Sequence, residues 1–124
     1  MQTYLQTHHP RIRLFIRDLL EHLKVRRRVI VEGPSSLEVS LRKRDEMLLV
    51  HLVNRAVNPT LTPRQFVVEE VPVTGRVQIK VRLAKRPSQV TLEPGRREVQ
   101  WTHSKGWLQI GVEGIHIHEI LAIG

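Results

Sequence analysis

The amino-acid sequence predicts a mainly β protein: an antiparallel β-sandwich of about eight or nine strands, preceded by one N-terminal amphipathic helix. Apolar residues recur every three or four positions before Arg28 and every second position after it. Turn-forming residues interrupt the later pattern about every ten residues, as in other sandwiches. Long helical segments do not separate the predicted strands, so a parallel sheet with crossover helices is not expected.

The helical pattern occupies residues 11–25 and is preceded by Pro10, whose fixed φ suits the first position of a helix. Spacings of three and four place the apolar residues in one stripe: Ile12, Phe15, Ile16, Leu19, Leu20 and Leu23. Arg17 and Glu21 are four residues apart and can form an ion pair on the other side of the helix. We therefore predict a helix from Arg11 to Val25 whose apolar stripe needs a surface to pack against.

Short segments with strand-like patterns follow the helix. They are residues 29–31, 37–41, 47–53, 66–68, 77–83, 90–92, 99–101, 108–112 and 115–123. The segment 47–53 is almost continuously apolar, which favours a strand covered on both faces. The charged residues 42–46 before it predict a connection. Turn signals such as Pro94-Gly95 and Lys105-Gly106 separate the later strands.

The chain of 124 residues is expected to form one domain, with a tail and helix at 1–25 and the sandwich at 26–124. The absence of cysteine excludes disulfides, thiolate metal sites and a cysteine nucleophile. No apolar run approaches the roughly 20 residues that cross a bilayer, so we expect no membrane partner. A secretory signal pattern is also absent, which favours a cytoplasmic location.

Basic residues outnumber acidic ones by 20 to 12, which gives a formal net charge of +8. The segment from Arg11 to Arg28 holds seven basic and two acidic residues, so most of the excess belongs to the helix and its exit. Two basic runs, Arg26–Arg28 and Arg42–Arg44, could bind phosphates. Nucleic-acid sites usually add aromatic platforms or a recognition helix, and only 4% of the residues are aromatic. We do not expect nucleic acid as a partner, and we keep anion or nucleic-acid binding as the least favoured alternative.

Patterns that carry catalysis are missing from the sequence. Its serines do not stand in a Gly-x-Ser-x-Gly turn, and there is no glycine-rich phosphate loop. Glu69 and Glu70 are adjacent on a predicted strand and would face opposite ways, so they do not form the carboxylate pair of a glycosidase. We therefore predict no catalytic residue and no cofactor.

His116 and His118, two residues apart on the last predicted strand, would point to the same face. Such a pair can bind zinc or copper when a third ligand is near, and His51 or His103 could supply it. Glu119 points the other way, however, and a hydrogen-bonded sheet histidine is the commoner arrangement. We therefore predict no metal site.

Trp101 and Trp107 flank the predicted turn 102–106, where a pair of indoles could stack on a sugar ring. Trp101 has the parity of Val99 and is expected in the core, whereas Trp107 is expected to be exposed or to contact another molecule. These residues, together with His103, are the candidate site of a carbohydrate-binding module, which is our second hypothesis.

Several segments together resemble a known family. They are Met47–Asn54, Glu70–Val73 leading into 77–83, Pro87–Leu92, the Trp101 strand and Ile117–Ile123. They are similar to the C-terminal β-sandwich domain of large hypothetical glycoside hydrolases of the β-galactosidase-like and α-fucosidase-like type. In those proteins a catalytic barrel and a flavodoxin-like trimerisation domain come first. The resemblance covers residues 26–124, and the predicted helix is similar to the segment that links the sandwich to the preceding domain.

The resemblance implies a non-catalytic accessory module, because the barrel that holds the catalytic carboxylates is not part of this sequence. We therefore expect a role in domain packing or assembly, with a catalytic domain as the partner or with self-association. The expected contact surface is the apolar stripe of the helix, represented by Ile12, Phe15, Leu19 and Leu23. A carbohydrate partner belongs to the second hypothesis.

Overall fold

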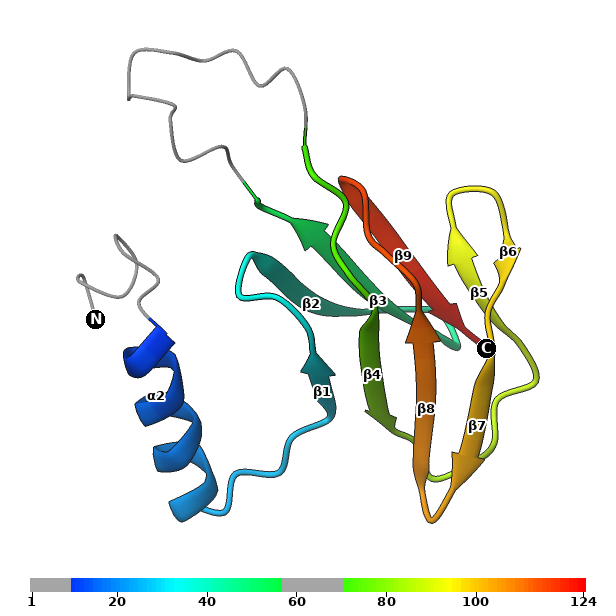
Figure 1. Ribbon diagram of the computed structural model, residues 1–124. Helices are drawn as coiled ribbons and strands as arrows, with labels where there is room; N and C mark the ends of the chain where they lie inside the picture. The colour runs from blue at the N-terminus through cyan, green and yellow to red at the C-terminus, as the bar shows by residue number, and fades with distance from the viewer. Residues whose placement is uncertain (1–9, 57–70) are drawn as a thin grey trace.

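The computed structural model describes residues 10–56 and 71–124, and within them the chain forms one helix and nine strands. The elements are α2 (Pro10–His22), β1 (Val29–Glu32), β2 (Leu37–Arg44), β3 (Met47–Asn54), β4 (Val77–Arg82), β5 (Val90–Glu93), β6 (Arg97–Glu98), β7 (Trp101–Ser104), β8 (Trp107–Val112) and β9 (His118–Ile123). The strands form two antiparallel sheets, with the helix beside β1 (Figure 1). The predicted fold class is confirmed, whereas the predicted strand at 66–68 lies outside the described residues.

One sheet has the strand order β1-β4-β8-β7, and the other has the order β2-β3-β9-β5-β6. The turn between β7 and β8 is Lys105-Gly106, where both residues have positive φ (51° and 76°), as two-residue hairpin turns favour. The register places Ile79 opposite Ile110 in the first sheet and Val50 opposite Leu121 in the second. Each sheet therefore gathers its apolar side chains on the face that meets the other sheet.

The core lies between the two sheets and is aliphatic. Its fully buried side chains are Val50, Leu52, Val77, Ile79, Val81, Leu108, Ile110, Ile115 and Leu121. Burying a side chain of this size contributes about 1.5–3 kcal/mol relative to leaving it exposed. On β3, Val50 and Leu52 are buried, whereas His51 and Val53 on the outer face are only half-buried. The sequence predicted that this continuous apolar run is a strand covered on both faces, and the structure shows that only one face is fully covered.

The helix ends at His22 rather than at the predicted Val25. Lys24 adopts a left-handed conformation, with a φ of 51°. The N–H of Lys24 donates to the Glu21 carbonyl (3.0 Å), and the N–H of Val25 donates to the Leu20 carbonyl (3.1 Å). These two bonds close the helix in a Schellman motif. Because the apolar spacing continues through Val25, periodicity alone did not reveal this end.

Several strand boundaries also differ from the prediction. In place of the predicted strand at 99–101 the structure has β6 and β7, and β7 includes residues 102–104 of the predicted turn. β2 continues through residues predicted as a charged connection, because they pair with β3 as far as Arg44, which lies opposite Met47. Charged side chains suit an edge strand, where they discourage pairing with another chain. β9 begins at His118 rather than at Ile115, because Ile115 is bound by Thr74 instead of a neighbouring strand. The Ile115 N–H donates to the Thr74 hydroxyl (2.8 Å), and its carbonyl accepts from the Thr74 N–H (3.0 Å).

Candidate functional site

A polar hollow of about 600 Å³ opens at the edge of the four-stranded sheet. β7 pairs with β8 only as far as Trp101, which lies opposite Ile110. One longer bond follows, from the N–H of Gly111 to the carbonyl of Gln100 (3.4 Å). Beyond it, the part of the chain that the structure describes offers the end of β8 no strand on that side. The hollow forms in the space left beside β8.

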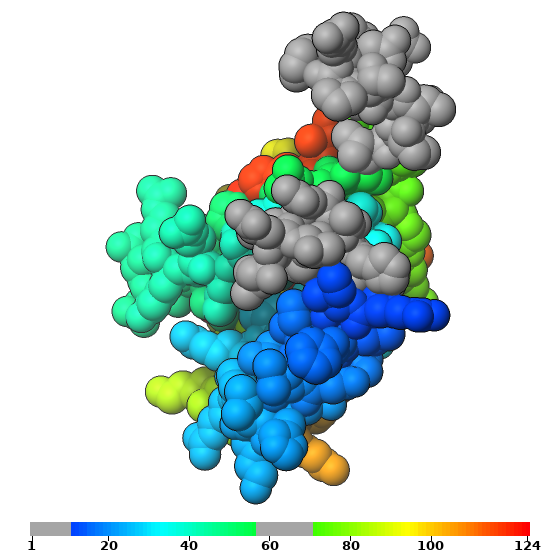
Figure 2. All heavy atoms as spheres, turned by 90° about the vertical axis from the view of Figure 1, so that its left-hand side faces the viewer, coloured from blue at the N-terminus to red at the C-terminus, as the bar shows by residue number. Residues whose placement is uncertain are grey.

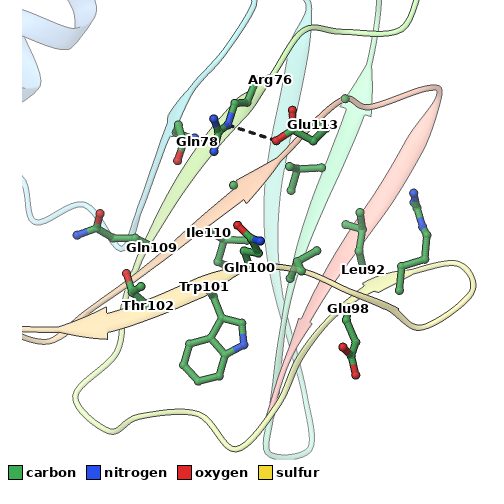
Figure 3. Close-up of a pocket in the computed structure, with 15 residues that line it drawn as sticks. Arg76, Gln78, Leu92, Glu98, Gln100, Trp101, Thr102, Gln109, Ile110 and Glu113 are labelled. Atoms are coloured by element: carbon green, nitrogen blue, oxygen red, sulfur yellow. Dashed lines mark ion pairs between the residues drawn. The ribbon is translucent and has the colours of Figure 1, made fainter.

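Gly111 forms the floor of the hollow beneath two long polar side chains. A Cβ atom at this position would lie 3.3 Å from Nη2 of Arg76 and 3.4 Å from Nε2 of Gln78. The missing side chain therefore lets both groups lie across the strand. Nε of Arg76 also lies 3.5 Å from Oε1 of Glu113 in an exposed ion pair. Figure 3 shows Arg76, Gln78 and Glu113 together at one end of the hollow.

The hollow also contains the amides of Gln100 and Gln109 and the hydroxyl of Thr102 (Figure 3). Amides and hydroxyls both donate and accept hydrogen bonds. The two carboxylates, Glu98 and Glu113, are exposed, whereas the acid of a glycosidase needs surroundings that favour its protonated form. The hollow is therefore lined by hydrogen-bonding side chains together with the exposed charged groups of Arg76, Arg97, Glu98 and Glu113.

The structure places the two predicted sugar-stacking residues on opposite faces of one sheet. Trp101 lies opposite Ile110 on the inner face and packs against the core while remaining partly exposed, as its parity predicted. Trp107 lies opposite Arg82 on the outer face, with the Arg82 guanidinium 5.9 Å from the ring centroid. The two indoles therefore do not form a common platform, and of the two only Trp101 lines the hollow.

Trp101 and His103 each contact a group at the end of the sheet. The guanidinium of Arg86 lies 5.2 Å from the ring centroid of Trp101, a contact worth about 0.5–1 kcal/mol at an exposed site. Nε2 of His103 lies 3.0 Å from the carbonyl oxygen of Leu83. His103 therefore links β7 to the chain that leaves β4 and does not line the hollow.

Of the predicted interface residues, Ile12, Phe15 and Leu19 lie on α2, and Leu23 follows its last residue. Phe15, Leu19 and Leu23 are 67%, 44% and 61% exposed, and Ile12 is half-buried. Figure 2 faces this side of the molecule and shows the helix lying across its lower part. The three exposed side chains are therefore available to another surface.

A groove of about 770 Å³ separates α2 from β1. Leu14, Ile16 and Leu20 line it from the helix, and residues 29–31 line it from the strand. The predicted stripe is thus divided: Ile16 and Leu20 face β1, whereas Phe15, Leu19 and Leu23 lie outside the groove.

The described part of the chain holds no helix long and apolar enough to cross a membrane.

The two basic runs lie in the segment after α2 and at the end of β2. Arg27 donates to Oε1 of Glu21 (2.9 Å) and so ties the segment after the helix back to α2. Arg26 and Arg28 beside it are exposed. Arg42–Arg44 form the exposed end of edge strand β2, where charge protects the edge. Neither run is accompanied by an aromatic platform in the described residues.

The histidines do not assemble as a group of three. Within residues 10–56 and 71–124, no cluster of three or more histidine or carboxylate side chains could hold a metal ion. His118 instead approaches His51 on the neighbouring strand, with their nearest ring nitrogens 3.1 Å apart. His116 is exposed, and His103 belongs to the other sheet.

Comparison with known proteins places the fold. No family model matches the sequence, and no curated protein matches it. Among solved structures, the chain is similar to alpha-L-fucosidase isoenzyme 2 from Paenibacillus thiaminolyticus, with a TM-score of 0.69 and 17% sequence identity. This chain has the fold of part of a fucosidase. The match covers 85% of this chain but 16% of the fucosidase, so this chain spans a small fraction of that protein's length.

Proposed function

We propose that this chain is a non-catalytic accessory module of a glycoside-hydrolase-like protein, and that α2 packs it against a neighbouring folded domain of that protein. One observation carries the proposal: the apolar side of α2 is exposed on a chain whose fold matches only 16% of a fucosidase. A domain that forms a small part of a longer protein has neighbours there, and it needs a surface on which they rest.

α2 and its exit present several large apolar side chains to solvent. Leu14, Phe15, Leu19, Leu23 and Val25 are each between 44% and 67% exposed. Burial of one such side chain contributes about 1.5–3 kcal/mol, so a surface that covers several of them gains enough to dock. The partner surface that covers these side chains should have acidic residues around its rim, because residues 11–28 of this chain hold seven basic and two acidic residues.

The hollow supports the non-catalytic part of the proposal. Its carboxylates lie at the surface, and the side chain of Glu113 is 85% exposed and paired with Arg76. A glycosidase instead holds two carboxyl groups about 5–10 Å apart in a site that separates their roles as acid and base. The described residues therefore favour a module that binds or packs over one that catalyses.

Replacing Leu19 and Leu23 together with aspartate should leave the chain folded and remove its association through α2. In the isolated chain, the uncovered side of α2 should drive weak self-association. Two buried charges in place of two leucines should weaken that association roughly 10²-fold or more. Sedimentation velocity over a range of protein concentrations measures the association, and circular dichroism during heating measures the fold.

A matched control replaces Met47 and Ile117 with aspartate. These side chains are 43% and 64% exposed away from the helix, so the control adds the same charge and removes similar apolar surface. It should keep the association of the parent chain. Unfolding of the Leu19 and Leu23 variant would show that the helix belongs to the core, and an equal loss of association in the control would show that α2 is not the contact. Either result would contradict the proposal.

Carbohydrate binding is the second candidate function, and the hollow is the observation that favours it. The amides of Gln78 and Gln109 line the hollow from the outer face of the four-stranded sheet, and the Trp101 ring lines it from the inner face. Amides and hydroxyls grouped in one hollow can donate and accept hydrogen bonds with the hydroxyl groups of a sugar. Of the two indoles, the site would involve only Trp101, because Trp107 does not line the hollow.

Titration with a panel of oligosaccharides, followed by tryptophan fluorescence, tests this second function. A saturable change is expected for at least one oligosaccharide, and Gln109→Ala should weaken it about ten-fold, because one hydrogen bond is lost. Trp107→Phe is the matched control and should bind like the parent chain. If the fluorescence shows no saturable change with any member of a broad panel, carbohydrate binding is ruled out for the hollow.

A further inference from the structure

His51 and His118 meet on the outer face of the five-stranded sheet. His51 lies on β3, and His118 is the first residue of β9. His118 lies opposite Val53, which follows His51 by two residues on β3. Nδ1 of His51 and Nε2 of His118 are 3.1 Å apart. The ring centroids are 5.3 Å apart, and the ring planes are inclined by 19°. Because the centroids are much farther apart than the nitrogens, the two nitrogens lie between the rings and face each other.

The facing nitrogens are both atoms that can bind a metal ion. In the metal-free pair, one nitrogen donates an N–H and the other accepts it. Each ring can instead carry its proton on the outer nitrogen, and the inner nitrogens then present two lone pairs to one point. The strand pairing that builds the sheet therefore brings two potential ligands together.

The spacing of the nitrogens matches that of two imidazoles on one ion. A zinc–nitrogen bond is about 2.0–2.1 Å long, so two nitrogens at an angle of roughly 90–109° on one ion lie about 2.9–3.3 Å apart. The observed 3.1 Å falls within this range. Each ring must turn by about 40° for its lone pair to point at an ion bonded to both nitrogens, which lies beside the line that joins them.

The surroundings of the pair allow an ion to enter. His118 is exposed and His51 is half-buried, so water can complete the coordination. The cross-strand neighbours of these two residues are Ser40, Val53 and Ile120, which carry no charge. No cationic side chain therefore stands directly opposite either histidine in the sheet.

We propose that His51 and His118 form a two-histidine clamp for a divalent late transition-metal ion. Cu²⁺ should bind most tightly, ahead of Ni²⁺ and Zn²⁺, as the general order of metal affinities requires. The ligands are 67 residues apart in sequence, so the clamp exists only when β3 and β9 are paired. Metal binding should therefore stabilise the folded chain. This inference does not depend on the proposed accessory role.

Titration of the full, metal-free chain with Cu²⁺ tests the clamp, and Ni²⁺, Zn²⁺ and Mg²⁺ are titrated separately. The parent for these experiments carries His8→Gln and His9→Gln, so that the N-terminal histidines do not contribute. One Cu²⁺ per chain is expected, with two nitrogen ligands in the electron paramagnetic resonance spectrum. Ni²⁺ and Zn²⁺ should raise the thermal unfolding midpoint, and Mg²⁺ should not.

Single substitutions separate the clamp from other surface histidines. His51→Gln and His118→Gln should each weaken binding roughly 10²-fold or more, because one imidazole lacks the gain of two linked ligands. His116→Gln is the matched control: it removes an exposed histidine next to the pair and should bind like the parent. Circular dichroism without metal shows whether each variant folds. If one of the two clamp variants does not fold, the other is enough to test the clamp. Unchanged affinity in a folded clamp variant, or loss of binding in His116→Gln, would overturn the proposal.

Discussion

Asn54→Leu should lower the free energy of unfolding by about 3–5 kcal/mol, because the part-buried carbonyls of Pro72 and His116 and the N–H of Ala56 lose their side-chain partner. Asn54 is the last residue of β3 and is 6% exposed. Its Nδ2 donates to the carbonyls of Pro72 (2.8 Å), His116 (2.8 Å) and Ile115 (3.3 Å). One side chain therefore joins three segments that the sheet ladders do not join.

Urea unfolding followed by tryptophan fluorescence measures this loss. Asn54→Asp should be at least as destabilising, because an ionised carboxylate cannot donate to the carbonyls, although it can still accept the N–H of Ala56 as Oδ1 does now (3.0 Å). Ser40→Ala, at an exposed position of β2, is the control and should change stability by less than about 0.5 kcal/mol. A loss below about 1 kcal/mol in both Asn54 variants would show that the contacts of this side chain are dispensable.

The sandwich could be predicted because its core positions alternate in the sequence itself. Ile79 and Val81 on β4, and Leu108 and Ile110 on β8, are buried on one face just as the two-residue spacing indicated. The end of the helix and the length of β2 could not be predicted in the same way. Both depend on hydrogen bonds, from Lys24 in a left-handed conformation and from strand pairing at Arg44, and apolar spacing does not report either.

The candidate site was harder to predict than the fold. Gln78, Gln109 and Gly111 lie on two strands, and in the sequence each has the pattern of an ordinary solvent-facing position. Only the register of β4 with β8 brings them to one hollow. The parity of Trp101 and Trp107 correctly separated a core position from an outer one, but their nearness in the hairpin suggested a common platform that the sheet does not form.

Pairing of distant strands also decided which histidines meet. The sequence placed His116 beside His118 because they are two residues apart, with His51 as a possible third ligand. In the structure β9 begins at His118, so its regular alternation does not include His116. The pairing of β9 with β3 instead brings His118 to His51. The two-residue spacing within one strand therefore did not reveal that His118 approaches His51.

Leu121→Ala should lower the free energy of unfolding by about 3–5 kcal/mol, as expected when a leucine is removed from a packed core. Leu121 lies on β9 and is fully buried. Its neighbours across the sheet are Val50 on β3 and Leu92 on β5, both of which are also buried. Because strands hold these neighbours in place, the cavity left by alanine cannot collapse easily.

The most direct test of the account compares Leu121→Ala with Phe15→Ala by urea unfolding, at protein concentrations where the chain is monomeric. The buried core lies between the two sheets, and we propose that the apolar side of α2 serves a partner rather than the stability of the chain. Phe15→Ala, at a side chain that is 67% exposed, should therefore change the free energy of unfolding by less than about 0.5 kcal/mol, against about 3–5 kcal/mol for Leu121→Ala. Comparable losses in the two variants would place the helix in the core of the isolated chain and contradict the account.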